Sequence, residues 1–248
     1  MTPAQLQKYM LETYFWLRVG LGALAFAFPL LLVVIGFSQG IPLQNALSDY
    51  YFAFAPPSSP LRVFPERVVF VGILSALGFF LLLYRGFSRT EGWLLNIAGL
   101  SAIVVALFPT APPDYCHNCG SGASATVHFV AATILFVSIA IDAWACTDQT
   151  LGELPPIERR WFRWWYDFLA LGMLVFPAAA VLLTYLLETP NKSIIAVEWA
   201  GIVTFAIYWG LKTYELSLSG AEKRALAGKL EPPPPATSLR RRIGTMLD

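Results

Sequence analysis

This chain of 248 residues is too apolar for a soluble protein, because 56% of its residues are hydrophobic, only 13% are charged and the mean hydropathy is +0.59. Soluble domains carry about 25% charged residues. The formal net charge of +1 indicates no acidic partner, and nucleic-acid motifs are absent, so nucleic acid is not an expected partner.

Six apolar runs are each long enough to cross a bilayer as a helix, which takes about 20 residues. The runs cover about residues 15–37, 67–84, 92–109, 125–146, 163–187 and 193–216. The expected fold is all-α: a polytopic membrane protein with an antiparallel bundle of six transmembrane helices and short connections. Residues 1–216 then form the transmembrane domain, and residues 217–248 form a cytoplasmic tail that contains Pro and Arg.

The basic residues are sorted by side of the membrane. With the N-terminus in the cytoplasm, 14 of the 17 Lys and Arg residues fall on that side, and only Arg62, Arg67 and Lys192 fall outside. Such a bias sets the orientation of helical membrane proteins. We therefore expect both termini in the cytoplasm and a multi-pass chain in a bacterial inner membrane, with the lipid bilayer as its first partner.

The remaining segments have simpler assignments. Residues 2–14 have apolar side chains at helical spacing and are expected to form an interfacial helix that leads into the first span. The outer loop 38–66 is rich in aromatic residues, which predicts a segment packed at the headgroup level. The third span contains Gly99, Ser101 and Ala102, small residues that allow another helix to approach closely.

The best candidate site lies near the outer face. Arg67 opens the second span, His128 lies a turn into the fourth span and Glu198 a turn into the sixth, so their side chains are expected at similar depth. Asp49 and Tyr50 in the first outer loop are placed to fold over them. Charged groups at such depth face the bundle interior and pair. Two interpretations stay open: a polar pocket for a headgroup or small ligand, and the more common structural salt bridge.

Polar residues also lie near the cytoplasmic ends of the spans, where Asn96, Asp142 and Asp167 are found. Asp142 and Asp167 could form a carboxylate pair that handles protons. The favoured interpretation is that each is neutralised by an arginine of the inner loop. Those arginines are Arg159, Arg160 and Arg163.

The cysteines indicate no cofactor. Cys116 and Cys119 lie in an outer loop, and the residue after them is Gly120, so the motif for covalent haem is absent. A zinc site built with nearby His and Asp side chains is conceivable, but a second ligand pair is missing. A local disulfide between Cys116 and Cys119 is the favoured interpretation in an oxidising compartment. Cys146, at the inner face, is expected to be a free thiol.

Several short stretches carry a family resemblance. They are Ser48–Tyr51, Arg67–Gly72, Tyr84–Gly86, Asn96–Leu100, Ala106–Pro109 and the later His128. Together they resemble an uncharacterised bacterial family of six-helix integral membrane proteins, with looser similarity to DRAM/Sfk-type proteins and to alkaline-ceramidase-like membrane hydrolases. The hydrolase resemblance implies a Ser, an Asp and three His around a metal.

Only part of that hydrolase constellation has counterparts in this chain. Asp49 and His128 could fill two of the roles and Ser48 or Ser75 a third, but the last two spans contain no His. A fold-level resemblance does not establish an activity.

Three functions from different classes follow from the sequence. The first is a non-catalytic accessory or scaffold subunit of a larger membrane assembly with protein partners, because no catalytic constellation is complete. The second is a lipid or small-amphiphile binding protein with a polar pocket at the outer leaflet. The third is a membrane-embedded hydrolase that uses the same residues.

Overall fold

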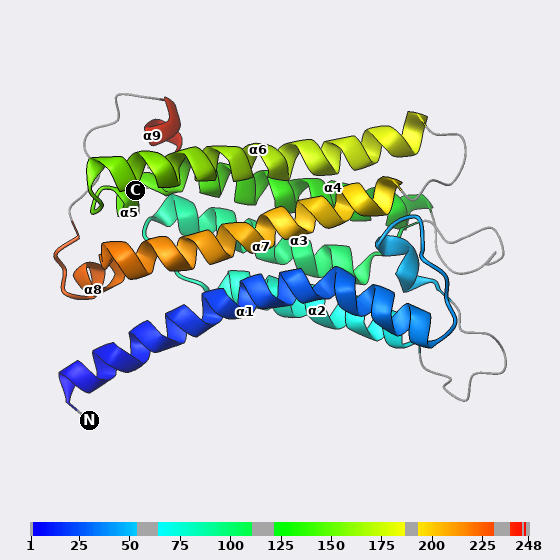
Figure 1. Ribbon diagram of the computed structural model, residues 1–248, viewed down its shortest axis with the longest axis horizontal. Helices are drawn as coiled ribbons and strands as arrows, with labels where there is room; N and C mark the ends of the chain where they lie inside the picture. The colour runs from blue at the N-terminus through cyan, green and yellow to red at the C-terminus, as the bar shows by residue number, and fades with distance from the viewer. Residues whose placement is uncertain are drawn as a thin grey trace.

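A computed structural model of the chain describes residues 2–53, 64–110, 122–186, 193–230, 239–244 and 246. Every regular element in these ranges is a helix (Figure 1). In chain order the elements are α1 (Pro3–Ser38), the 3₁₀-helix η1 (Ser48–Tyr51), α2 (Pro65–Leu83), α3 (Arg89–Leu107), α4 (Gly122–Ile141), the π-helix η2 (Asp142–Cys146), α5 (Asp148–Leu151), α6 (Pro156–Leu186), α7 (Ser193–Ser219), α8 (Ala221–Leu226) and α9 (Leu239–Gly244).

Six of these helical stretches are long and apolar enough to cross a membrane. They are α1, α2, α3, the stretch Ala123–Leu151 that joins α4 to η2 and α5, α6 and α7. The prediction of an all-α chain with six membrane-length helices is therefore confirmed, and the composition of these helices supports a multi-pass integral membrane protein.

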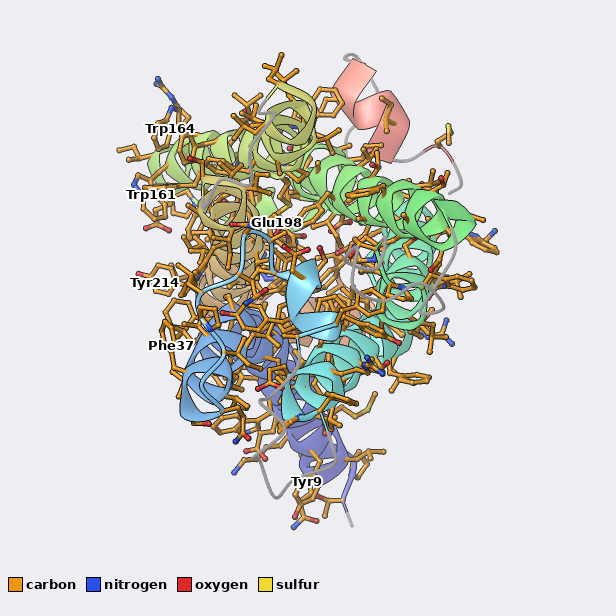
Figure 2. All side chains as sticks on the ribbon, turned by 90° about the vertical axis from the view of Figure 1, so that its right-hand side faces the viewer. Tyr9, Phe37, Trp161, Trp164, Glu198 and Tyr214 are labelled. Atoms are coloured by element: carbon orange, nitrogen blue, oxygen red, sulfur yellow. The ribbon has the colours of Figure 1, made fainter. Side chains whose placement is uncertain are left out.

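The six long helices pack as a closed ring. Helix α1 packs against α2, α2 against α3, α3 against α4, α4 against α6, α6 against α7, and α7 against α1. Figure 2 looks along the ring from the end over which η1 lies, which we call the η1 end. The N-terminus of α1, α8 and α9 lie at the opposite end, which we call the α8 end (Figure 1).

Helix α1 is longer than the predicted first span because its start is strongly capped. The Oγ1 atom of Thr2 accepts a hydrogen bond from the N–H of Gln5 at 3.3 Å, and the side chain of Gln5 accepts one from the N–H of Thr2 at 2.8 Å. Pro3 then occupies the first helical turn, where its missing N–H costs nothing. The expected interfacial segment is thus continuous with the first span, and its first turns project beyond the bundle (Figure 1).

Helices α2 and α3 touch backbone to backbone. A Cβ atom added to Gly78 would lie 2.7 Å from the carbonyl oxygen of Gly99, and one added to Gly99 would lie 2.6 Å from the carbonyl oxygen of Gly78. Ser101 and Ala102 are also buried on α3. The expected use of small residues for close helix approach is therefore what the structure shows.

Large apolar side chains cover the outside of the ring. On α6 the exposed set recurs at helical spacing, and Figure 2 shows Trp161 and Trp164 at the periphery. An apolar exterior of this extent suits lipid rather than water. The exposed side chains of α6 include Trp164, Phe168, Leu171, Val175 and Leu182.

Candidate functional site

A cavity of about 160 Å³ lies inside the ring, and all six long helices contribute to its wall. Its lining is mainly apolar and aromatic, with Phe28, Phe70, Phe136 and Phe205 among the side chains that face it. The polar lining residues include Ser48, His128 and Glu198, which come from the η1 end of η1, α4 and α7. The cavity therefore combines an apolar interior with a polar end.

Glu198 ties the segment before η1 to α7. Its Oε2 atom accepts a hydrogen bond from the N–H of Leu47 at 2.6 Å, and Figure 2 places its side chain beside η1 at this end of the ring. Leu47 and Glu198 both line the cavity. The carboxyl group thus holds η1 over the end of the cavity while remaining part of the wall.

Asp49 and Tyr50 shape η1 itself. The Oδ2 atom of Asp49 accepts from the N–H of Ala46 at 3.0 Å, which closes the turn that leads into the 3₁₀-helix, and burial raises the pKa of Asp49 above its usual value. Tyr50 is fully buried and packs on Gly36 of α1, where an added Cβ would lie 2.7 Å from the tyrosine ring. Neither side chain lines the cavity; both position the helix that covers it.

Arg67 of α2 binds the segment made of Leu47 and η1, which we call the covering segment. Its Nε–H donates to the carbonyl oxygen of Tyr51 at 2.8 Å, and its guanidinium lies 4.7 Å from the ring centroid of Tyr51 and 4.9 Å from that of Phe64. The salt bridge proposed between Arg67 and Glu198 does not form, because each has its polar contacts with backbone groups of the covering segment. Arg67 is therefore a clamp on the covering segment rather than a counter-ion in the cavity.

His128 is buried in α4 and its Nδ1 atom lies 2.8 Å from the carbonyl oxygen of Phe108. A carbonyl oxygen can only accept, so Nδ1 carries a proton, and in the neutral imidazole Nε2 then carries a lone pair. The structure therefore brings two of the five predicted site residues, His128 and Glu198, to the cavity. It places Asp49 and Tyr50 on η1, which covers the cavity, and Arg67 on α2, from which it binds η1.

The polar region at the α8 end contains a network of buried charges, of which sequence analysis named only Asp142. We call it the buried charge network, and its members are Arg18, Glu91, Asp142, Lys212, Glu215 and Glu222. All but Glu222 are almost completely buried. Four acids thus share the α8 end of the ring with two bases, and these side chains come from α1, α3, η2, α7 and α8.

Lys212 and Glu215 of α7 form the centre of this network. The Nζ atom of Lys212 lies 3.6 Å from Oε2 of Glu215 and donates to Oγ1 of Thr150 at 3.2 Å. Thr150 and Tyr166 also donate hydroxyl hydrogen bonds to Oε2 of Glu215, at 3.1 and 3.3 Å. The spacing of Lys212 and Glu215, three residues apart on one helix, is a pattern in the sequence that predicts such an ion pair. The sequence analysis used Lys212 only as one of the 14 basic residues on the cytoplasmic side.

The prediction that an arginine of the inner loop neutralises Asp142 is wrong. Asp142 is buried, its Oδ2 atom accepts from the hydroxyl of Tyr208 at 2.6 Å, and its Oδ1 atom has no hydrogen-bond partner. Nearby, Glu91 accepts from the N–H of Phe87 at 2.6 Å. Asp142 opens the π-helix η2, a local distortion that turns its side chain inward and that sequence periodicity does not announce.

The other inner-face residues pair locally. Asp167 binds Arg240 of α9 at 2.7 Å rather than an arginine of the inner loop. Arg163 binds Asp148 at 2.7 Å, and Arg159 donates to the backbone carbonyl of the last residue of α5 and to two carbonyls just after it. The predicted carboxylate pair of Asp142 and Asp167 therefore does not form, because tyrosine and tail partners take each carboxyl separately.

The structure describes some, but not all, of the residues considered for a metal site or a disulfide. Within the described residues, no group of three or more His, Cys, Asp and Glu side chains converges in a way that could hold a metal ion. Cys146 is buried and is a free thiol, as expected. Cys116 and Cys119 lie outside the described residues, so their disulfide stays a prediction.

The comparisons with known proteins found no relative of this chain. No protein-family model, no curated protein and no solved structure matches the chain.

Proposed function

We propose that this protein binds a lipid or small amphiphile inside its ring of helices. The observation that supports this is the cavity of about 160 Å³, which is apolar over most of its wall and polar at the η1 end. Ligand sites are typically concave, mostly apolar and provided with a few placed polar groups. An apolar chain can occupy the aromatic interior while its polar group meets Ser48, His128 and Glu198.

The proposal includes an orientation. We place the six helices antiparallel, with the α8 end in the cytoplasm and the η1 end at the outer leaflet of a bacterial inner membrane. The support is the sorting of the basic residues, of which 14 of 17 lie on the side of the termini. The polar end of the cavity then lies at the depth of the outer headgroups, where an amphiphile from that leaflet can enter.

Filling the cavity tests the proposal. Ala180 lines the cavity and Ala178 is exposed on the same helix, so Ala180→Phe removes space inside and Ala178→Phe adds the same bulk outside. After extraction in mild detergent, native mass spectrometry is expected to find a bound amphiphile on the wild type and on Ala178→Phe but not on Ala180→Phe. Equal occupancy in all three proteins, or none in the wild type, contradicts the proposal. Ala132→Phe, also in the cavity wall, replaces Ala180→Phe if that variant fails to fold.

A second proposal, an accessory or scaffold subunit of a membrane assembly, rests on a different observation. The first turns of α1 project beyond the bundle (Figure 1), and Leu6, Tyr9 and Met10 are exposed there; Figure 2 shows Tyr9 at the periphery. A projecting apolar helix face suits contact with another protein. The same purification separates the proposals, because a subunit brings a stoichiometric protein partner that is lost when residues 2–10 are deleted.

A further inference from the structure

We infer that the amphiphile taken by this cavity carries a protonated amine, rather than a phosphate, sulfate or carboxylate, as its polar group. The inference rests on the proposed function, because it names the chemical class of the ligand of the same site. It is carried by the hydrogen-bonding capacity of the polar lining residues and by the charge around them.

The carboxyl group of Glu198 provides the main acceptor. Its Oε2 atom already accepts from Leu47, and the side chain lines the cavity and is partly exposed. A carboxylate has about four lone-pair sites, so one backbone N–H leaves most of its accepting capacity unused. An ammonium group offers three N–H donors and a positive charge to such a carboxylate.

The neighbouring polar side chains are acceptors as well. His128 uses Nδ1–H on the carbonyl of Phe108, which leaves Nε2 as a lone pair. Thr133, also in the wall, uses its hydroxyl hydrogen on the carbonyl of Phe129 at 2.8 Å, so its oxygen keeps only accepting capacity. A ligand group made of acceptors, such as a phosphate, would find a donor among these four polar lining side chains only on Ser48, whose hydroxyl can equally accept from an ammonium group.

The charged residues at the η1 end also favour a protonated amine over an anionic group. Among the residues described there, Asp49, Glu66 and Glu198 are acids and Arg67 is the base. Arg67 is held on the backbone of Tyr51 and between two aromatic rings, outside the cavity wall. Glu66 is buried and its Oε1 atom has no hydrogen-bond partner, so in the described part of this end three acids stand against one base. An anionic headgroup would be repelled and a cationic one attracted.

A matched set of twelve-carbon probes tests the inference: dodecylamine, dodecanoate and dodecanol. Each is titrated into the full-length protein in phosphatidylcholine nanodiscs, and the signal of Ala180→Phe is subtracted as the background of partition into lipid. Dodecylamine is expected to bind about tenfold or more tightly than dodecanoate, as a charge-assisted hydrogen bond allows. Glu198→Gln keeps an acceptor for Leu47 but removes the charge, and it is expected to reduce that preference to roughly threefold or less.

The outcomes separate this inference from the proposed function. Dodecanoate that binds as tightly as dodecylamine, or a preference that persists in Glu198→Gln, overturns the amine assignment and leaves amphiphile binding intact. If none of the three probes binds above the Ala180→Phe background, the proposed function itself fails. Glu158→Gln serves as the matched control, since this exposed glutamate at the start of α6 lies outside the cavity wall and its loss is expected to leave the order of the probes unchanged.

Discussion

Individual residues show how differently a charge can be used at the two ends of this ring. At the η1 end, Glu198 and Arg67 each bind backbone groups of the covering segment and do not bind each other. At the α8 end, Lys212 and Glu215 lie deep between helices and share hydroxyl partners. The residue types and their spacing predicted that charges were present, but their partners depended on neighbours that are distant in the chain.

Removal of Lys212 is expected to destabilise the protein severely. The Lys212→Met variant leaves Glu215 buried without its cation, and breaking a buried ion pair in this way costs about 3 to 5 kcal/mol. Adding Glu215→Gln is expected to recover most of the loss, because glutamine still accepts from Thr150 and Tyr166. Thermal unfolding in detergent measures both variants. Lys223→Met, at an exposed lysine of α8, is the control; a loss no larger than the control's would contradict the role assigned to the network.

At the scale of the elements, the sequence was enough to predict that the long helices exist. It was only partly enough to predict where each helix begins and ends. Helices α2, α3 and α7 begin within a few residues of the predicted spans, whereas α1 begins at Pro3 and α6 at Pro156. Hydropathy marks where a helix enters lipid, while capping and local hydrogen bonds decide where the helix itself begins. The π-helix η2 and the covering helix η1 depend on contacts with other elements, so no periodic pattern announces them.

The contact between α2 and α3 provides a test at this scale. Gly78→Ala would place a methyl group 2.6 Å from Ile103 and 2.7 Å from the backbone of Gly99, so the helices must separate. We expect a loss of about 1 to 3 kcal/mol, typical of overpacking, as a lower melting temperature in detergent. Gly72→Ala is the matched control on α2, because no atom lies within 4 Å of its added Cβ. Equal melting temperatures for the two variants would exclude a tight contact.

At the scale of the whole molecule, the cavity has a polar end beneath η1, and the opposite end of the ring holds the buried charge network. The apolar cavity ends against a layer that contains Phe205 and Leu81, and Trp209 lies beyond it, with its ring centroid 6.3 Å from that of Phe205. In the network an ion pair connects α1 to α8, and hydrogen bonds connect α7 to α5, α6 and η2. This arrangement suits a rigid, closed α8 end and a ligand that enters from the η1 end.

The proposed orientation can be tested by labelling single cysteines. In a background without the three native cysteines, Pro42→Cys lies at the η1 end and Lys229→Cys follows α8. A maleimide that cannot cross membranes is expected to label Pro42→Cys in intact cells and Lys229→Cys only after permeabilisation, because the basic side stays in the cytoplasm. The reverse pattern would invert the orientation and place the polar end of the cavity at the inner leaflet.

By itself, the sequence determined that the chain is all-helical and that six of its helices can span a membrane, because hydropathy acts along the chain at short range. The distribution of its basic residues supports the proposed orientation. The sequence also placed His128 and Glu198 among the site candidates, since charged or titratable groups are rare in spans. Only the tertiary structure decided that Arg67 clamps η1, that Lys212 and Asp142 lie in a buried network, and that a cavity separates the two ends. Those features depend on which helices become neighbours, and the closure of the ring is set by packing between residues far apart in the chain.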